Sequence, residues 1–369
     1  MQVLIACDSF KDALDAQNVC RAIARGLKQA HPGIIVREMP LSDGGEGVLD
    51  ILRKALDLKN LTLEVCDPLG RPVTAAYGIS ADGGTALVEM AAASGLQLLT
   101  LTERNPLLTS TYGTGQLLAD ARAQGARTAL LAIGGSATTD AGIGMAAALG
   151  WQFLDGTGGM VKPDGGNLQQ IARIVPPPQK LFDKVEVLCD VTNPLFGPSG
   201  AAWVYGPQKG GNTESLTHLD KGLRHIAALA ADQLGRPGLA EVPGAGAAGG
   251  LGFGGMAFLD ATLKRGIEMV LDLVGFDAAV KDADLVITGE GHIDSQSLQG
   301  KLIQGVCARA GATPVIALCG KVSASPEDVR AVGLKAAYSI NREQRPLAQM
   351  LAATAENLER SAASLPLTG

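Results

Sequence analysis

Short apolar runs alternate with amphipathic helical stretches at both ends of the chain, and this alternation restricts the fold more than any other feature of the sequence. Near the start, an apolar run at 3–6 precedes a helical stretch at 16–30 whose apolar residues recur about every four positions. A second strand at 34–39 and a second helix at 47–55 follow. This order is typical of a parallel sheet covered by helices.

The C-terminal end repeats the pattern. Strands are expected at 284–288, 314–318 and 336–340, and helices at 302–310, 326–332 and 346–363. The middle of the chain has less regular strands and more turns, and 369 residues suffice for about two domains. We therefore expect one parallel α/β domain built from both termini, residues 1–70 plus 280–369, into which a second domain, 71–279, is inserted.

Composition narrows the classes of partner. The net charge is −6 with scattered basic residues, and only 4% of residues are aromatic, which argues against nucleic-acid binding. Six cysteines without a CxxC pair, and an N-terminus without a secretory pattern, indicate a cytoplasmic protein. The charge-free stretch Val242–Leu259 holds seven glycines and is predicted to be a soluble glycine-rich loop rather than a membrane span.

Glycine is enriched and clustered. The chain has 48 glycines among 369 residues, against roughly 7% in average proteins. They gather at 44–47, 134–144, 156–166, 197–211 and 244–255. Glycines at strand ends allow tight turns and a close approach of the backbone to a ligand.

Acidic loops follow three of the expected strands of the terminal domain. They are Asp8–Lys11, the 40–47 loop with Asp43 and Glu46, and the 289–301 loop with Glu290 and Asp294. Because the carboxyl ends of parallel strands lie along one edge of a sheet, these side chains could converge on a ligand. Helix capping, for instance by Ser42 or Asp43, is the alternative for each single acid.

The stretch LLAIGGSATTDAGIG at 130–144 predicts an anion site in the inserted domain. A strand at 130–133 and a helix at 141–149 would leave helix N-terminal amides exposed between them, where they attract phosphate oxygens. Small residues let the backbone come close, and Thr138 and Thr139 could add hydroxyl donors. Asp140 would either cap the helix or face a metal, and plain capping stays open as the alternative for the whole stretch.

Several common enzyme motifs are missing or isolated. The GxGxxG match at 244–249 lacks a convincing preceding strand, and the chain has no P-loop, no HRD kinase loop, no HExxH and no GxSxG. What remains is carboxylates, lysines and glycine loops. That combination suits Mg²⁺ bound together with phosphate.

Taken together, the loops resemble one family, the bacterial glycerate kinases of sugar-acid and glyoxylate pathways. The resemblance rests on DSFK, DGGEG, EMAAASGL, TSTYGTGQLL, GGSATTDAGIG, DVTNPLFGPSGAA, GPQKGG, GAGAAGGLG and TGEGHIDSQSLQGK, in that order along nearly the whole chain. It implies a Rossmann-like domain interrupted by a second α/β domain with a mixed sheet. It also implies ATP-dependent phosphorylation of D-glycerate, at the 2-hydroxyl, with 3-phosphorylation and a non-catalytic sugar-acid sensor as alternatives.

The resemblance also guides the expected site. Lys11 or Lys209 would hold the glycerate carboxylate, and Asp190, or second Asp43, would accept the proton of the attacking hydroxyl, which makes these four the catalytic set. Mg²⁺ would be held by residues among Asp43, Glu46, Glu290 and Asp294. The remaining expected contacts are Ser9, Lys11, Asn193 and Lys209 for substrate and Gly134, Gly135, Ser136, Thr138, Thr139, Asp140, Gly289, Glu290 and Lys301 for phosphate or nucleotide. The partners would be small molecules only, D-glycerate and ATP, with no nucleic acid and no membrane, and the protein a monomer or homodimer.

Overall fold

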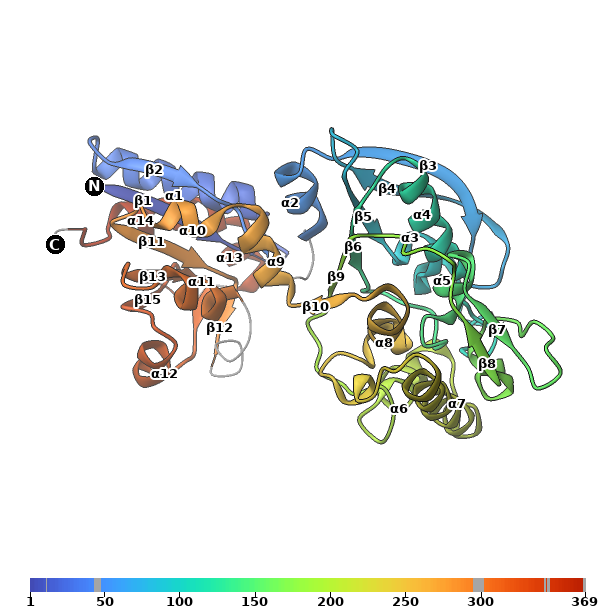
Figure 1. Ribbon diagram of the computed structural model, residues 1–369. Coiled ribbons are helices and arrows are strands. Elements are labelled where there is room, and N and C mark those ends of the chain that lie inside the picture. The colour runs from blue at the N-terminus through green and yellow to red at the C-terminus, as the bar shows by residue number, and fades with distance from the viewer. Residues whose placement is uncertain (11, 43–47, 295–301, 342, 344–345, 368–369) are drawn as a thin grey trace. The chain divides into compact units, whose positions relative to one another are not determined.

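The computed structural model describes residues 1–10, 12–42, 48–294, 302–341, 343 and 346–367. Its contacts divide the chain into two units. Unit 1 consists of Met1–Leu56 and Gly266–Gly369, and unit 2 of Asp57–Arg265. Figure 1 shows a sheet flanked by helices in each unit.

Unit 1 is built on a parallel five-stranded sheet in the order β15-β13-β11-β1-β2. The strands are β1 (Gln2–Cys7), β2 (Ile35–Glu38), β11 (Leu285–Gly289), β13 (Val315–Cys319) and β15 (Ala336–Ser339). A short parallel pair, β12 (His292–Ile293) with β14 (Lys321–Val322), lies beyond the carboxyl ends of β11 and β13. Apart from the exposed Gln2 at the start of β1, the central strands β1, β11 and β13 are buried runs, as expected where helices cover both faces.

The helices of unit 1 lie between its strands in the sequence and after the last of them. They are α1 (Ala16–Ala30), α2 (Val48–Ala55), α9 (Gly266–Leu273), α10 (Phe276–Val280), α11 (Leu302–Ala310), α12 (Pro326–Ala331), α13 (Leu347–Ala352) and α14 (Thr354–Ala363). Helices α1 and α14 pack on the face of the sheet that carries Val3, Ile5 and Ile287. A side chain at Gly26 would collide with the backbone of Glu359, so a glycine there lets α1 and α14 approach closely.

Unit 2 contains a mixed six-stranded sheet in the order β10-β9-β6-β5-β4-β3. Its strands are β3 (Lys59–Cys66), β4 (Pro72–Ile79), β5 (Thr85–Glu89), β6 (Thr128–Ala132), β9 (Lys184–Leu188) and β10 (Thr262–Lys264). The last four run parallel, whereas β3 and β4 are antiparallel neighbours at one edge. A two-stranded antiparallel pair, β7 (Gln152–Leu154) and β8 (Arg173–Val175), stands apart.

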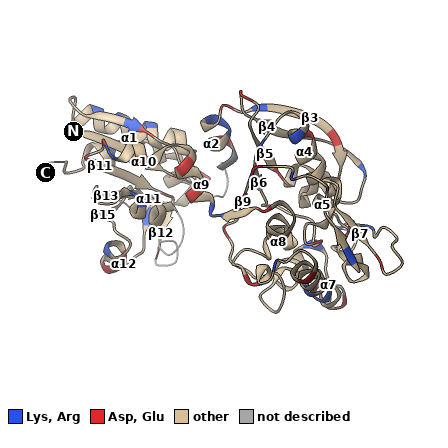
Figure 2. Cartoon of the chain, in the orientation of Figure 1, with Lys and Arg blue, Asp and Glu red and all other residues tan. Residues whose placement is uncertain are grey.

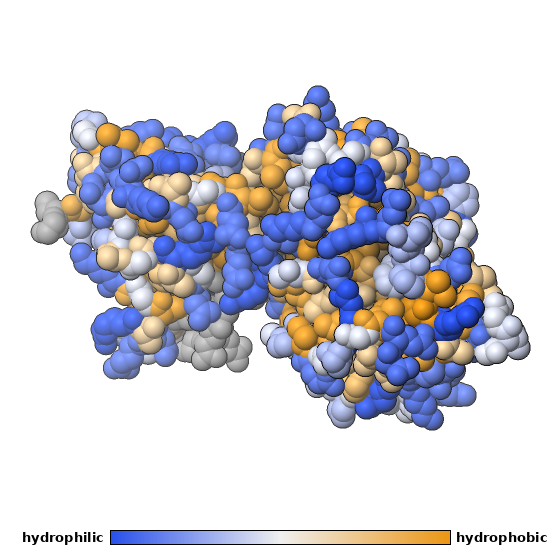
Figure 3. All heavy atoms as spheres, in the orientation of Figure 1, coloured by the Kyte–Doolittle hydropathy of each residue, from blue (hydrophilic) through white to orange (hydrophobic). Residues whose placement is uncertain are grey.

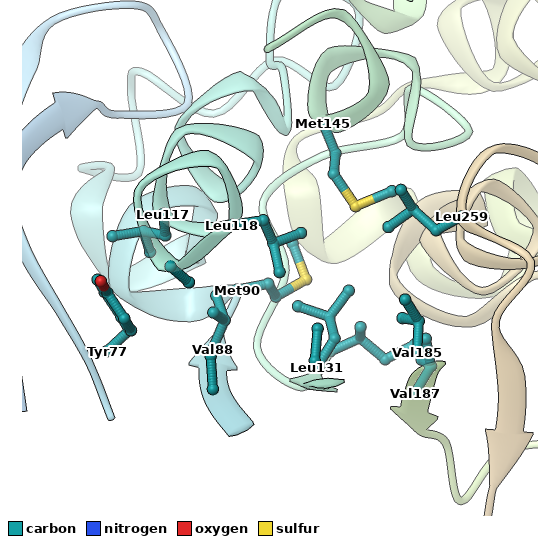
Figure 4. Close-up of a cluster of buried hydrophobic side chains, with 14 of the residues drawn as sticks. Tyr77, Val88, Met90, Leu117, Leu118, Leu131, Met145, Val185, Val187 and Leu259 are labelled. Atoms are coloured by element: carbon teal, nitrogen blue, oxygen red, sulfur yellow. The ribbon is translucent and has the colours of Figure 1, made fainter. Parts of the chain in front are cut away.

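The helices of unit 2 are α3 (Ala91–Ser94), α4 (Tyr112–Ala123), α5 (Ile143–Ala148), α6 (Ala201–Tyr205), α7 (Thr213–Gln233) and α8 (Ala247–Leu259). Figure 4 shows how Leu117 and Leu118 of α4, Met145 and Leu259 pack against strand residues such as Leu131. This core holds the carboxyl ends of β5, β6 and β9 at a fixed edge, from which the candidate site is built.

The predicted fold class is confirmed: a parallel-sheet α/β domain built from both termini, with an inserted α/β domain that contains a mixed sheet. The helices expected at 16–30 and 302–310 have those bounds. The helix expected at 346–363 is divided in two at Ala353. The boundaries 1–70 plus 280–369 and 71–279 stay a prediction.

The prediction of a loop at Val242–Leu259 is wrong, because most of this stretch forms α8. Near its start α8 is kinked by left-handed backbone at Ala248, Gly249 and Gly250, and the helix is almost entirely buried. Side chains at Gly254 or Gly250 would collide with the backbone near Ala141, so glycine serves close packing here rather than looseness. Within the described residues, no helix combines the length and apolarity of a membrane span. On the face drawn in Figure 3, hydrophilic and hydrophobic residues are interspersed.

Candidate functional site

The loop that follows β6 is the best-defined candidate site in unit 2. Gly134 and Gly135 are exposed, whereas the chain from Ser136 to Asp140 is buried. Gly135 has a φ of +72°, and at Gly134 a side chain would point into open space. The loop therefore presents bare backbone to solvent, a surface that an anionic oxygen can approach closely.

The neighbouring segment around α3 holds this loop in place. The Leu96 amide donates to the Gly135 carbonyl over 2.9 Å, and the Ala137 amide donates to the Ser94 carbonyl over 2.9 Å. The Thr109 hydroxyl donates to the Ala137 carbonyl over 3.1 Å. The bare backbone is thus a fixed surface rather than a loose turn.

Lys209 lies directly beneath the loop and is only 1% exposed. Its Nζ donates to Ser136 Oγ over 2.8 Å and to the Thr138 carbonyl over 2.6 Å. Burial lowers the pKa of Lys209 to about 7, while the charge of Asp140 acts in the opposite direction. A lysine this deeply buried is uncommon, and an amine with a lowered pKa next to accessible backbone makes Lys209 a candidate functional residue.

Asp140 is fully buried and accepts four hydrogen bonds. They come from the Thr111 amide (2.7 Å), Thr111 Oγ1 (2.8 Å), the Gly142 amide (3.1 Å) and the Gly144 amide (3.2 Å). Burial raises the pKa of Asp140, and these donors oppose the rise. The capping alternative therefore describes Asp140, and the two amides at the start of α5 that were expected to face phosphate are already bonded.

The hydroxyls of Thr138 and Thr139 are buried as well. Neither side-chain oxygen has a hydrogen-bond partner among the residues that the structure describes. They lie below the exposed backbone instead of on its surface, so Gly134 and Gly135 form the accessible part of the predicted anion site. The roles predicted for residues 134–140 toward phosphate remain predictions.

The entry to α8 supports the loop from the other side. Gly249 has a φ of +68°, and a side chain there would collide with the Thr138 carbonyl. The Gly249 carbonyl accepts from the Ala141 amide over 3.1 Å, and Ala141 itself has a φ of +54°. Left-handed backbone at a residue other than glycine is uncommon, and here two such residues, Ala141 and Ala248, lie beside the loop.

Asp190 follows the strand next to β6. In the parallel ladder Ala132 pairs with Leu188, so Gly134 and Asp190 leave adjacent strands at the same register. Asp190 is exposed. The structure thus brings the predicted proton acceptor to the edge that carries the glycine loop.

Asn193, an expected substrate contact, forms hydrogen bonds within its own segment of the chain. Its amide nitrogen donates to the Ser199 carbonyl over 2.8 Å, and its Oδ1 accepts from the Tyr205 hydroxyl over 2.6 Å. Both ends of the amide are therefore used to fold the 190–205 segment. A role for Asn193 toward substrate stays a prediction.

In unit 1, several residues predicted to bind ligands lie at or just after the carboxyl ends of the central strands β1 and β11. The buried carboxylate of Asp8 accepts from the Ser9 amide over 2.6 Å and from Ser9 Oγ over 3.2 Å. The Gly289 carbonyl accepts from the Asp8 amide over 2.9 Å, and a side chain at Gly289 would collide with the Leu318 backbone. Glycine at 289 is thus explained by packing.

Glu290 and Asp294 are half-buried and flank β12. Lys11, Asp43, Glu46 and Lys301 lie outside the described residues. In the part of the chain that is described, no three His, Cys, Asp or Glu side chains gather as a metal-binding group. The metal set therefore stays a prediction.

Two functional features were missed by reasoning from the residues. Thr111 anchors Asp140 and also accepts from the Met145 amide over 2.8 Å. The motif around Thr111 contributed only to the resemblance, because nothing in its local pattern reveals a partner 29 positions away. The depth of Lys209 was equally hidden, since a lysine in a glycine-rich turn normally faces water.

Comparisons with known proteins cover the whole chain. A family model described as the glycerate kinase family matches residues 3–367. The chain is 46% identical to glycerate kinase of Bacillus subtilis (strain 168), over 98% of this chain and 96% of that one. It is 40% identical to glycerate 2-kinase of Escherichia coli (strain K12), over 100% and 98% of the two chains. A crystal structure of a candidate glycerate kinase 2 from Salmonella typhimurium LT2 matches with a TM-score of 0.85 and 40% identity, covering 98% of this chain and 96% of that one.

Proposed function

The chain belongs to the glycerate kinase family, and we propose that it transfers the γ-phosphoryl group of ATP to the 2-hydroxyl of D-glycerate. The observation that carries this proposal is the match over essentially full length to relatives named glycerate kinase and glycerate 2-kinase, at 40–46% identity. The 2-hydroxyl is chosen because one of those relatives is named a 2-kinase. We infer ATP as the phosphate donor because the family is one of kinases.

Phosphoryl transfer asks a protein mainly to position its ligands and to neutralise charge. We assign the first task in unit 2 to the bare backbone of Gly134 and Gly135. Lys209 supplies positive charge from below, fixed by its bonds to Ser136 Oγ and the Thr138 carbonyl. An anionic oxygen resting on the two glycines would approach this charge across a low-dielectric layer, where electrostatic attraction is stronger than in water.

Asp190 is our first choice as proton acceptor for the attacking hydroxyl, with Asp43 second. The support for Asp190 is its exposure and its place beside the glycine loop at the ends of two adjacent strands. An acid at this edge can accept the proton of a substrate hydroxyl while the loop holds anionic oxygens of the ligands. Lys11 remains the alternative to Lys209 for the carboxylate of glycerate.

The described acids of unit 1 have the ligand chemistry that Mg²⁺ prefers. Glu290 and Asp294 are half-buried carboxylates at the carboxyl end of the sheet, and Mg²⁺ usually takes one or two carboxylates plus water and phosphate oxygens. We propose that these two residues, with Asp43 and Glu46, would hold it. When bound, the ion would neutralise charge on the ATP phosphates.

Phosphorus NMR of the reaction products tests the proposal directly. With D-glycerate, ATP and Mg²⁺, we expect formation of ADP together with 2-phosphoglycerate. The 3-phosphate as product would overturn the assignment to the 2-hydroxyl and favour the 3-kinase alternative. Binding of glycerate without any ADP release would instead favour a sensor.

We further propose that the protein works in the cytoplasm on small molecules alone, as a monomer or homodimer. Its six cysteines are all free thiols, in keeping with a reducing compartment. Lys and Arg are interspersed with Asp and Glu over both units in Figure 2 instead of forming a basic stripe. Fractionation of the source cells and light scattering of the purified protein test these two points.

A further inference from the structure

Unit 1 contains a large cavity, and of the residues assigned a ligand so far only Ser9 is among those that line it. Its volume is about 1080 Å³, and it opens at the carboxyl ends of β1 and β2, between the start of α1, helix α2 and the end of α9. This is the edge of a parallel sheet at which ligands of doubly wound folds bind. The volume is at the upper end of the range of small-molecule sites.

One wall of the cavity is apolar. The half-buried side chains of Ile51 and Leu273 supply its accessible apolar surface, and the buried side chains of Phe10, Met39 and Leu41 back it. These residues come from the loop after β1, the end of β2, α2 and α9. Such a wall suits a flat or apolar group rather than a fully hydrated one.

The opposite side is acidic. Five carboxylates line the cavity against three basic side chains, Arg21, Arg37 and Lys54. The start of α1, where a phosphate would otherwise be favoured, is occupied by its own Asp15, which accepts from the Asn18 amide over 2.8 Å. The excess of negative charge disfavours phosphate and favours a ligand part that brings hydroxyl or amino donors.

Glu38 is the acid that such donors would meet. It is the last residue of β2, half-buried, and lines the cavity. Within the described residues its carboxylate forms no hydrogen bond or ion pair. Because Glu38 is half-buried and faces the cavity, its carboxylate is free to accept a charge-assisted hydrogen bond from a ligand hydroxyl that replaces water there.

We propose that this cavity binds the adenosine part of ATP, with the ribose hydroxyls donating to Glu38 and the purine ring against the accessible apolar side chains of Ile51 and Leu273. The inference rests on the proposed function for the identity of the nucleotide. A ribose held by an acid at the end of the second strand of a β-α-β unit is a geometry that parallel sheets of this kind support. The phosphates would then point away from the acidic side.

The test compares nucleotides that differ only in the ribose. Binding of ATP, 2′-deoxy-ATP and 3′-deoxy-ATP is measured by calorimetry without glycerate, for the wild-type protein, Glu38→Gln and the control Glu64→Gln, which changes an exposed glutamate of β3. We expect the wild type and the control to bind ATP about tenfold more tightly than either deoxy form. Glu38→Gln should bind all three alike, at the weaker level.

Discrimination that survives in Glu38→Gln would overturn the proposal, as would a wild type that does not distinguish the ribose forms. A thermal unfolding curve for each variant shows whether it is folded and so distinguishes misfolding from a loss of binding. The assay needs no turnover, so tight and ribose-selective ATP binding without phosphoglycerate formation would refute the proposed function alone. Turnover of glycerate with ribose discrimination unaltered in Glu38→Gln would refute this inference alone.

Discussion

Replacing Lys209 by methionine tests the physical basis of the glycine-loop site. Methionine keeps the length and apolar stem of the side chain but cannot take up a proton. In the folded protein the pKa of Lys209 is lowered to about 7 by burial, whereas in the unfolded chain a lysine titrates near about 10.4. Between these two values the unfolded state binds more protons than the folded state, so this group makes the wild type gain stability as pH rises.

The size of the effect follows from the two pKa values. At pH 7 the unfolded chain holds the proton almost fully and the native site about half, which costs the folded state about 4 kcal/mol. At pH 9.5 the same cost is only about 1 kcal/mol. The stability of the wild type relative to Lys209→Met should therefore increase by about 3 kcal/mol between these pH values. Any weakening of the bonds to Ser136 and Thr138 when the amine loses its proton is already contained in the pKa of the folded state, and the rest of their loss is the same at both pH values.

Urea unfolding at pH 7 and 9.5 measures this difference. Lys221→Met, which removes an exposed lysine of α7, is the matched control, and its curves should keep a constant offset from those of the wild type. A constant offset for Lys209→Met as well would mean that Lys209 stays fully charged in the native protein. The argument that burial tunes this amine would then be refuted.

Three further substitutions test the site. Asp190→Asn should lower kcat on the order of a hundredfold if Asp190 accepts the proton; Asp183→Asn, an exposed acid just before β9, is the control, and near-normal turnover of Asp190→Asn would remove the assignment. Thr111→Val should reduce the free energy of unfolding by about 3 kcal/mol, because it removes one bond to the buried Asp140 carboxylate and leaves the Met145 amide without its acceptor. Thr111→Ser should cost under about 1 kcal/mol; equal losses would contradict a hydroxyl role. Gly249→Ala should lower kcat/KM by about a hundredfold by displacing the loop backbone, whereas Gly238→Ala, also left-handed but in open space, should leave kcat/KM unchanged; an active Gly249→Ala would show that the loop tolerates the shift.

Periodicity predicted the fold well because the two ends of the chain are simple in physical terms. Buried runs such as 285–289 can be strands of a covered parallel sheet, and α1 has a polar face and an apolar face. The stretch at 242–259 misled because glycine content was interpreted as looseness. In the folded protein those glycines exist to bring α8 against the backbone at Ala141, and such a contact has no signature in one sequence.

The candidate site was likewise predictable from the sequence only in part. The strand–loop–helix at 130–149 was visible locally, as were the small residues that leave Gly134 and Gly135 bare. The partner of Asp140 was not, because Thr111 reaches it from the residue that precedes α4, 29 positions away. Local rules could offer capping or metal binding for Asp140, and only the four donors gathered in three dimensions decide between them.

The position of Lys209 explains why the loop has so few side chains. Two exposed glycines offer an anion only backbone amides, so a full positive charge must come from behind them. An exposed lysine would be mobile and strongly hydrated, whereas one held by Ser136 Oγ and the Thr138 carbonyl is fixed at one place. The cost of about 4 kcal/mol is large for a protein whose net stability is typically about 5–15 kcal/mol. Asp140 limits that cost by favouring the charged amine, which leaves Lys209 about half protonated near neutral pH. If the loop binds an anion as proposed, we expect the arriving phosphate or carboxylate to supply the missing opposite charge and draw the proton onto Lys209, so that the amine becomes fully charged only in the bound state.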